Sequence, residues 1–526
     1  MRMNISRLLH ATRRRLSEEG GFTMIIAMGV LMVTALLVAA TFVALEQDAH
    51  LGQSDLNGKK AYYAARAGMN SYLYQLNQNS SYWQTCSNDS VSSWTTVPGN
   101  TTGQSYEYSP VPANGNSACN SSNIVNSMID TNSGSLTMKF FGQSGQSGTA
   151  DPPVQRGLVA SFRRISPLDY LYYTVYEALD SSIGSTYSGC GVWYRVGTRP
   201  SQCNIYWASA DTINGGMYTQ DQFLVNTGAS PTFGRNSSDK IATLAGSLCG
   251  NGCQNAVING TIVTNYFDPE PNDNSGLLND ATSYGKVYSG ITTIQLGTPS
   301  STQATVTNCP STCTTSVVDL TQYPIIYVQN NTGCSPAQYD PYNTSYPTSG
   351  CAGDVYVSGN YTTSATIAAA NNIIVTGNVT TTTSGGVPTG NAVLGLVANQ
   401  FVRVEHAESN RGDSIGSCGT EGTSINNPTI DAAIMSLQHS FIVDNFDCGT
   451  THGTLTIYGA LVQRFRGTVA TSSSGTIVTG YAKNYNYDDR LKYLAPPYLF
   501  DILTSGWEIS RETQCVPNGS STATAC

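Results

Sequence analysis

The sequence predicts a mainly β protein carried on a long N-terminal α-helix, and three observations lead to that expectation. Residues 20–45, GGFTMIIAMGVLMVTALLVAATFVAL, form an uncharged run. As a helix, such a run is long enough to cross a bilayer core of roughly 30 Å. Short β-branched segments that end in Gly or Asn recur through residues 211–480. All 14 cysteines follow the apolar run, which favours an oxidising compartment for the rest of the chain.

The composition bounds the possible partners. Charged residues make up 11% of the 526 residues, against roughly 25% in ordinary globular domains. The net charge is −9, and no cluster of Lys and Arg follows the first 21 residues. Binding to phosphates needs such a cluster. We therefore expect no nucleic-acid partner.

The first 79 residues divide into a basic leader, residues 1–21, and a helix, residues 22–79. The leader's arginines predict that the residues after the helix face outward. A secretory signal peptide has a shorter apolar region, of roughly 7–15 residues. Beyond the membrane the helix is expected to continue as a packing stripe, against the protein's own body or neighbouring helices. The stripe residues are spaced by three or four: Ala61, Ala65, Met69, Leu73 and Leu76.

The cysteines fall into sequential couples, and neighbour pairing is our hypothesis, because connectivity does not follow from sequence alone. The candidates are Cys86 and Cys119, Cys190 and Cys203, Cys249 and Cys253, Cys309 and Cys313, Cys334 and Cys351, Cys418 and Cys448, and Cys515 and Cys526. The alternative is a Cys₄ zinc site, since the couples at 249–253 and 309–313 have CxxxC spacing. An exported, oxidised chain disfavours free thiolates.

After the helix we expect an irregular, loop-rich α+β segment at residues 80–210 and a right-handed β-solenoid at residues 211–480. An internal repeat carries the second expectation: DVYVSGN at 354–360 matches NIIVTGN at 372–378, an offset of 18 residues. Repeats at roughly this period are typical of solenoids, whose rungs stack equivalent strands.

In such a solenoid, Val355 and Val357 would stack over Ile373 and Val375, with alternate side chains turned inward. The alternative is a β-sandwich, which also has short strands at regular spacing. A sandwich needs no sequence similarity between its strands, so the repeat favours the solenoid.

The stretch RRRLSEEGGFTMIIAM resembles the leader of type IV pilins and pseudopilins. The resemblance implies cleavage by a prepilin peptidase between Gly21 and Phe22. Major pilins carry Glu at the fifth mature position, and this chain has Ile26 there. That departure suits an accessory subunit better than a major one.

Further segments resemble one family of large pilin-like proteins, those with a type IV pilus assembly PilX-type N-terminal domain. KKAYYAARAGMNSYLYQL resembles the family's helix, and residues 157–179, containing DYLYYTVYE, resemble a segment that follows it. NAVLGLVANQFVRV, LTIYGALVQRFRGTV and GYAKNYNYDDRLKYLAPPYLF resemble blocks of its solenoid and C-terminal cap. The resemblance implies a C-terminal cap and tail at residues 481–526.

The possible catalytic and metal-binding groups of the sequence form no recognised pattern, so we expect neither an enzyme nor a cofactor. The candidate carboxylates are Asp444, Asp447, Asp488 and Asp489. The histidines that could join a metal site with Glu405 or Glu408 are His406, His439 and His452. Isolated polar histidines are the commoner explanation. The sequence contains no Walker A, GxSxG or HExxH motif.

The sequence therefore favours a minor or accessory pilin-like protein of a type IV pilus or related filament. We expect one membrane pass, an extracytoplasmic body and possible incorporation into a surface filament. Expected partners are the membrane, a prepilin peptidase and other pilin-like subunits, while the Thr- and Tyr-rich exterior would suit a surface glycan. The alternatives are a tethered β-helix carbohydrate-active enzyme and an unprocessed single-pass surface protein.

Overall fold

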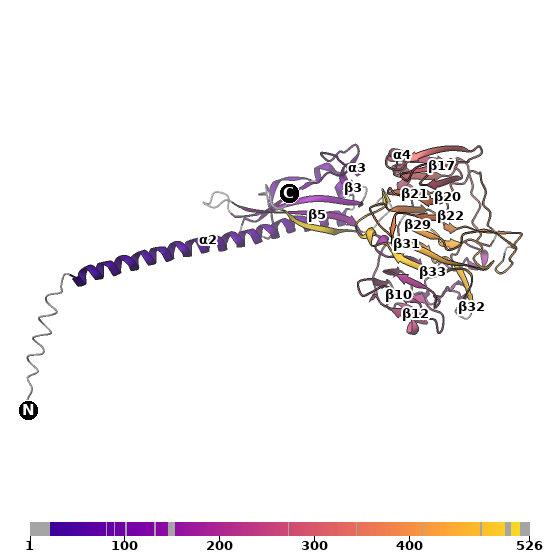
Figure 1. Cartoon of the computed structure of the whole chain (residues 1–526), viewed down its shortest axis with the longest axis horizontal. Helices are drawn as coiled ribbons and strands as arrows, with labels where there is room; N and C mark the ends of the chain where they lie inside the picture. Colours follow the sequence, from indigo (N-terminus) through magenta and orange to yellow (C-terminus); the bar gives the residue numbers. More distant parts are fainter. Residues whose placement is uncertain are drawn as a thin grey trace, which may run out of the picture.

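The computed structural model describes residues 22–515 apart from residues 80, 89, 100–102, 131–132, 146–152, 272, 343, 413, 474–475 and 500–505. The predicted leader with Gly21 and the tail with Cys526 lie outside these residues. In the described part, a long helix leads into a small antiparallel sheet, and a larger, mainly parallel sheet forms the body (Figure 1). The prediction of a mainly β chain with a long N-terminal helix is confirmed.

Helix α2 (Phe22–Gln78) has 57 residues and no proline, so nothing in its sequence interrupts the backbone hydrogen bonds. At 1.5 Å per residue it is about 85 Å long. Its first half projects away from the rest of the chain, and its second half lies along the antiparallel sheet (Figure 1). The helix is therefore both a projecting stem and part of a packed domain.

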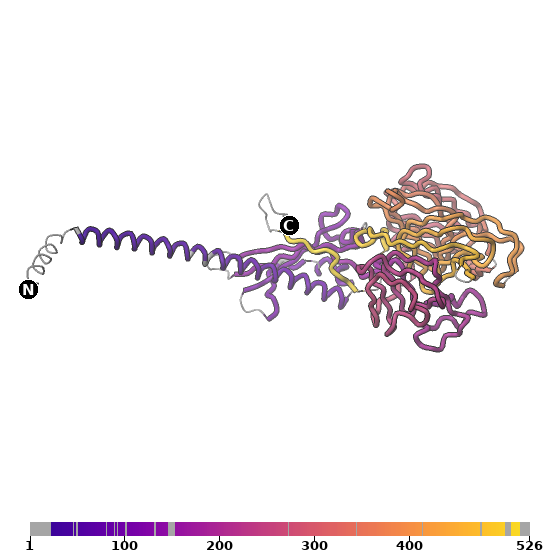
Figure 2. The backbone as a smooth tube through the Cα atoms, turned by 60° about the horizontal axis from the view of Figure 1, so that its bottom comes forward, coloured from indigo at the N-terminus to yellow at the C-terminus, as the bar shows by residue number. Residues whose placement is uncertain are grey.

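The antiparallel sheet has the order β1-β2-β4-β5-β34, with β3 paired to β4. Its strands are β1 (Val91–Thr96), β2 (Ser105–Pro110), β3 (Ile129–Asp130), β4 (Ser135–Ser144), β5 (Val154–Arg164) and β34 (Trp507–Cys515), and helix α3 (Ile124–Met128) precedes β3. We expected residues 80–210 to be irregular and rich in loops, but part of this segment forms the sheet. Strand β4 is regular, and alternate residues along it are buried. Figure 2 shows the C-terminal segment returning to this sheet.

The body is a 22-stranded sheet. Its strands are β6 (Tyr172–Tyr176), β7 (Thr212–Asn214), β8 (Met217–Thr219), β10 (Thr232–Phe233), β11 (Lys240–Thr243), β13 (Val257–Ile258), β14 (Thr261–Val263), β15 (Lys286–Ser289), β16 (Thr292–Leu296), β17 (Gln303–Asn308), β18 (Thr314–Asp319), β19 (Ile325–Gln329), β20 (Val355–Asn360), β21 (Ala365–Ala369), β22 (Ile373–Thr380), β25 (Leu394–Ala398), β26 (Val402–Val404), β29 (Thr429–Ser436), β30 (Phe441–Val443), β31 (Thr451–Phe465), β32 (Ala470–Ser473) and β33 (Thr476–Tyr487).

Smaller elements decorate this sheet. Three two-stranded pairs are β9 (Phe223–Leu224) with β12 (Cys249–Asn251), β23 (Thr383–Ser384) with β24 (Val387–Pro388), and β27 (His406–Ser409) with β28 (Thr420–Ser424). Helix α4 (Ser275–Tyr284) lies beside β15 and β19. Short 3₁₀ turns are η1 (Tyr82–Gln84), η2 (Cys86–Asn88), η3 (Pro167–Asp169), η4 (Ser185–Tyr187), η5 (Tyr194–Val196), η6 (Ser201–Cys203), η7 (Cys253–Asn255) and η8 (Asp489–Lys492).

Parallel ladders run through the body. One follows β15-β19-β21-β25-β29-β31-β6-β8-β11-β14, a second follows β16-β20-β22-β26-β30, and a third follows β29-β31-β33-β7-β10-β13. In the second ladder Val355 pairs with Ile373 and Val357 with Val375, as the 18-residue repeat predicted. All four side chains are buried, so matching apolar residues stack along the ladder.

The order of strands in space differs from their order in the chain. Strand β6 pairs with β31, and β7 pairs with β33, so the last strands of the body lie between its first and middle strands. Residues 212–263 form one end of the body, and the chain then crosses to the other end, where α4 and β17 lie (Figure 1). The C-terminal strands thus join the two halves.

Six disulfides join neighbouring cysteines in the described residues. They are Cys86–Cys119, Cys190–Cys203, Cys249–Cys253, Cys309–Cys313, Cys334–Cys351 and Cys418–Cys448. These are the couples that the sequence pointed to, and the seventh includes Cys526, outside the described residues. The alternative Cys₄ zinc site is wrong, because all four of its sulfur atoms are in disulfides.

Candidate functional site: the apolar stem and its attachment

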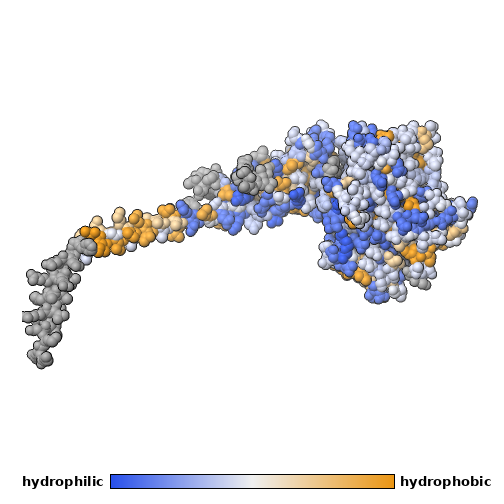
Figure 3. All heavy atoms as spheres, in the orientation of Figure 1, coloured by the Kyte–Doolittle hydropathy of each residue, from blue (hydrophilic) through white to orange (hydrophobic). Residues whose placement is uncertain are grey.

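The first part of α2 exposes an apolar surface along its length. Residues 23–45 contain no charged side chain and have no share buried within the protein. Figure 3 shows this segment as a hydrophobic rod leading to a largely hydrophilic body. Its 23 residues span about 35 Å, enough for a bilayer core of roughly 30 Å. By length and composition, this segment can anchor the protein in a membrane.

Ile26 lies within this apolar segment and is 52% exposed. It stands at the fifth position counted from Phe22, where the resemblance to pilins led us to look for a glutamate. An apolar residue costs nothing in the bilayer, whereas a carboxylate there would need a partner. The stem surface therefore presents side chains for lipid or for another apolar helix.

The second part of α2 packs on the antiparallel sheet through the predicted stripe. Ala61, Ala65, Met69 and Leu76 are fully buried, and Leu73 is partly buried. Between these stripe residues lies Tyr72, whose ring centroid is 5.3 Å from that of Tyr108 and 6.1 Å from that of Phe140. The stripe is therefore occupied by the chain's own sheet, one of the two predicted possibilities.

Small residues let the helix approach the sheet closely. A Cβ atom added at Gly142 on β4 would collide with the backbone of Ala61 and Ala65. One added at Gly68 would lie 2.7 Å from the Tyr106 ring. At Gly142 the helix and the sheet therefore meet backbone against backbone, and this close packing fixes the stem relative to the sheet.

The C-terminal strand β34 locks the end of the stem. The Asn77 side chain accepts a hydrogen bond from the Trp507 backbone N–H at 2.7 Å and donates to the Trp507 carbonyl at 3.0 Å. Trp507 also packs edge-to-face on Trp83, with ring centroids 6.3 Å apart. Residues 430 positions apart thus meet at the point where the helix ends.

An ion-pair network connects the antiparallel sheet to the body. Arg163 on β5 donates to Asp169 at 2.6 Å and to Glu508 at 3.1 Å. Asp169 belongs to η3, the turn that leads into the body strand β6. The pKa of Arg163 is raised, because the two carboxylates outweigh its burial. Arg163 therefore remains a cation that holds three segments together.

The structure places the predicted carboxylate Asp444 in a buried internal network. Its carboxylate accepts two hydrogen bonds from Arg403, both at 2.9 Å, and one each from Tyr339 at 2.6 Å and Tyr346 at 2.7 Å. Burial, followed by the charge of Asp444, raises the pKa of both tyrosines, so they stay protonated as donors. All the acceptor capacity of Asp444 is used within the protein.

The other predicted acids are also engaged. Asp447 pairs with Arg411 at 3.1 Å, and Asp488 pairs with Arg490 at 2.7 Å. Asp489 pairs with Arg235 at 2.7 Å and with Lys492 at 2.8 Å. The structure therefore uses these four acids as ion-pair partners.

The three predicted histidines separate into two groups. His439 pairs with Asp180 at 3.0 Å and stacks on Phe401, with ring centroids 4.5 Å apart. His406 and His452 lie together beside Glu421, a residue that the sequence search missed. The pairing of β27 with β28 brings Glu421 to the two histidines, and the spacing of these residues in the sequence does not predict the contact.

The chain's similarity to known proteins is slight. Neither a family model nor a curated protein matches it. A solved structure that it resembles is the competence-associated pilin ComZ from Thermus thermophilus, with 12% sequence identity and a TM-score of 0.30. That match covers 87% of this chain and 97% of the other chain. Function therefore has to be inferred from the chain's own residues.

Proposed function

We propose that this chain is a minor or accessory pilin-like subunit, anchored by residues 22–45 and projecting its body outside the cell. One observation carries the proposal: a single helix is exposed and apolar over its first part and buried under its own sheet over its second. A membrane anchor needs the first property, and a rigid connection to a body needs the second. The same helix can leave the bilayer for a filament core, where apolar helices pack on one another.

The leader sequence supports maturation between Gly21 and Phe22 by a prepilin peptidase. Resemblance to the PilX-type family, in the leader, the AYYAARAGMN segment and the C-terminal blocks, supports the accessory assignment. Ile26 supports it as well, because no carboxylate is available at the fifth mature position to pair with a neighbour's terminal amine. Partner subunits would then be other pilin-like helices.

The parallel ladders support a right-handed β-solenoid as the architecture of the body. Equivalent apolar residues stack along them, as between β20 and β22, and glycines occupy positive-φ positions at several strand ends. A solenoid presents long, flat outer faces, which suit contact with a surface or a glycan. The internal pairing of Asp444 and Asp447 favours such a mechanical role over catalysis.

Maturation is the step to test first. The full chain is expressed in host cells with and without a prepilin peptidase and is recovered from the membrane fraction. Mass spectrometry then identifies its N-terminal residue. We expect the peptidase to remove residues 1–21 and leave Phe22 first. Gly21→Leu should block cleavage, while the neighbouring Gly20→Ala should not. An intact Met1 in the presence of active peptidase would contradict the pilin assignment and leave an unprocessed membrane protein.

Incorporation into filaments is the second test. Filaments sheared from cells that make a complete pilus system are probed for the chain with and without an intact Gly21. We expect the processed chain in the sheared fraction at a low ratio to the major subunit. Retention of all processed chain in the membrane fraction would count against assembly.

A further inference from the structure

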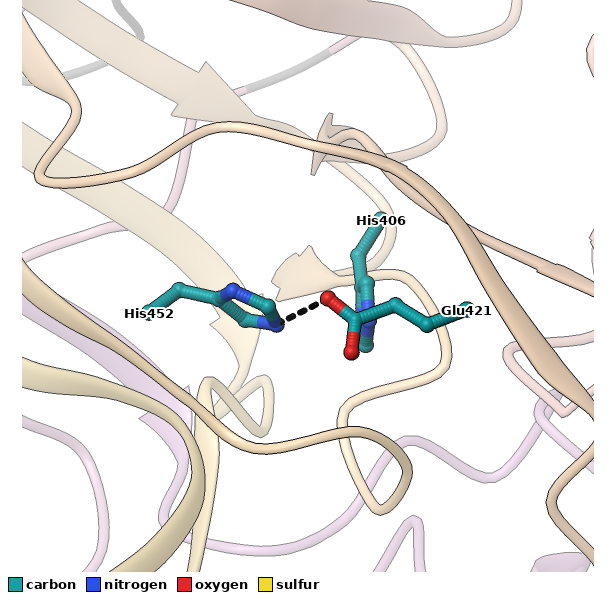
Figure 4. A group of neighbouring side chains, drawn as sticks. All are labelled: His406, Glu421 and His452. Carbon is teal, nitrogen blue, oxygen red and sulfur yellow. Dashed lines mark ion pairs between the residues drawn. The ribbon is translucent and has the colours of Figure 1, made fainter.

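Three potential metal ligands converge from three segments that are far apart in the sequence. His406 begins β27, Glu421 lies on β28, and His452 lies near the start of β31 (Figure 4). One ligand atom from each lies within 4.8 Å of the other two. The shortest separation is 3.3 Å, between His452 Nε2 and Glu421 Oε1. Both histidines are buried, and the Glu421 side chain is one-third exposed.

The surroundings of His406 fix the direction of its free nitrogen. Its Nδ1 lies 3.1 Å from the carbonyl oxygen of Asp444, which can only accept a hydrogen bond. Nδ1 therefore carries the proton, and the neutral ring has its lone pair on Nε2, directed into the cluster. The His406 backbone is held as well, because its carbonyl accepts from Asn445 Nδ2 at 2.6 Å. A hydrogen bond from the ring Nδ1–H to a carbonyl oxygen is the usual outer contact of a metal-binding histidine.

Both Nε2 atoms are buried and make no hydrogen bond among the described residues, and the 3.3 Å contact of His452 with Glu421 is an ion pair only if the ring is protonated. A buried polar atom without a hydrogen bond is destabilising and rare in native proteins, so it calls for an explanation. Neutral imidazole is the form that binds metal ions.

Gly449 faces the cluster without a side chain. A Cβ atom there would lie 2.9 Å from Glu421 Oε2 and 3.2 Å from His406 Nε2, so any side chain would fill the gap between them. The neighbouring disulfide Cys418–Cys448 ties the hairpin to the same loop. The cluster therefore lies in a covalently constrained part of the fold.

A second carboxylate adds negative charge to the cluster. Glu408 Oε1 lies 3.9 Å from His406 Nε2, its side chain is 1% exposed, and its Oε2 accepts from the Gly419 N–H at 3.2 Å. A divalent cation held by the two imidazoles would therefore have a second carboxylate close by to balance its charge.

We propose that His406 Nε2, His452 Nε2 and the Glu421 carboxylate bind a divalent transition-metal ion of the Zn²⁺ type. Two imidazoles and one carboxylate suit Zn²⁺, whereas Ca²⁺ and Mg²⁺ prefer oxygen ligands alone. Zinc bonds of about 2.0–2.2 Å place ligand atoms roughly 3.3 Å apart, so a gap of 4.8 Å would have to close by about 1.5 Å. Water takes the fourth position through the exposed side of Glu421. The ion cross-links the hairpin β27–β28 to β31.

The test uses the full chain in detergent, with a tag that contains no histidine and with its disulfides intact. The protein is stripped with a chelator, dialysed and titrated with ZnCl₂ against a competing dye, and bound zinc is counted by elemental analysis. We expect one zinc ion per chain and a rise in the thermal unfolding midpoint on loading. His452→Ala and Glu421→Gln should each weaken binding by about 100-fold or more.

The matched control is His439→Gln, since His439 belongs to the separate pair with Asp180 and should leave zinc binding unchanged. Glu421→Gln keeps the size of a partly exposed side chain, so this variant is expected to fold, which circular dichroism checks. Equal zinc affinity in the wild type, Glu421→Gln and His452→Ala would overturn the proposal. So would an absence of zinc from the folded wild-type protein, or full displacement of zinc by equimolar Ca²⁺.

Discussion

The buried carboxyl group of Asp268 makes the stability of the body depend on pH. Its side chain is 1% exposed, and neither carboxyl oxygen has a hydrogen-bond partner among the described residues. It lines a cavity of about 170 Å³ together with Asp169, Lys240 and Glu508. Burial, and then the charge of Asp169, raises the pKa of Asp268 from 3.8 to about 7.

The sign of the effect follows from linkage. Well below pH 3.8 the carboxyl group is neutral in both the folded and the unfolded chain, so it costs nothing. As pH rises toward 7, the unfolded chain releases its proton while the folded chain retains it, and stability falls. Above pH 7 the loss is complete. A difference of about three pKa units corresponds to about 4 kcal/mol, and we take about 2–4 kcal/mol as the range.

Asp268→Asn removes this dependence, because the amide does not titrate. Urea unfolding of both proteins, followed by tryptophan fluorescence between pH 4 and pH 8, measures it. We expect the two to differ by less than about 1 kcal/mol at pH 4 and the variant to be more stable by about 2–4 kcal/mol at pH 8. Asp319→Asn is the control. Thr321 lowers the pKa of the exposed Asp319, so this substitution should act weakly and with the opposite sign. A constant difference between wild type and Asp268→Asn across the range would refute the argument.

Three further predictions concern packing and covalent constraints. Gly142→Ala should push α2 off its sheet and cost about 1–3 kcal/mol, measured by thermal unfolding, whereas Gly52→Ala, in open space on the same helix, should cost nothing. Asp444→Asn breaks a buried pair with an arginine and two tyrosine hydrogen bonds, and should lower the free energy of unfolding by about 3–5 kcal/mol in urea. Joint replacement of Cys334 and Cys351 by Ser removes the disulfide between cysteines 17 positions apart. It should lower the free energy of unfolding by about 3 kcal/mol, seen as a lower unfolding midpoint.

Each of these has an outcome that would contradict it. Unchanged melting of Gly142→Ala would mean that the helix and sheet are not in backbone contact. A loss below 1 kcal/mol for Asp444→Asn would mean that water reaches the network. An unchanged midpoint for the double cysteine variant would mean that the loop around residues 334–351 is held by its other contacts.

The stem and the local repeats could be predicted from the sequence because their signals are periodic. The stripe through Ala61 and Met69 has helical spacing, and the match between Val355 and Ile373 has a fixed offset. Both depend on residues near one another in the chain. Neighbouring cysteines are also close in the fold, so sequential pairing was a sound guide for the six described disulfides.

Contacts across long separations could not be predicted. Nothing in the sequence indicates that β6 pairs with β31 or that β34 returns to β5, because the apolar patterns of these strands are compatible with many partners. The meeting of Glu421 with His452 depends on a hairpin whose residues are mostly polar and exposed. The loops and the Cys418–Cys448 disulfide place this hairpin beside His452, and hydrophobic periodicity does not predict that placement.

The return of β34 to β5 has a mechanical consequence. The whole body is inserted between these two antiparallel strands, so two covalent connections, not one, join it to the stem. A load on the body is therefore shared between two chain crossings, and the body cannot swivel freely about a single linker. The same arrangement sets the order of synthesis, because the antiparallel sheet gains its last strand, β34, only after the body has been made. A chain truncated before Trp507 would carry an open strand edge on β5, ready to pair with another copy.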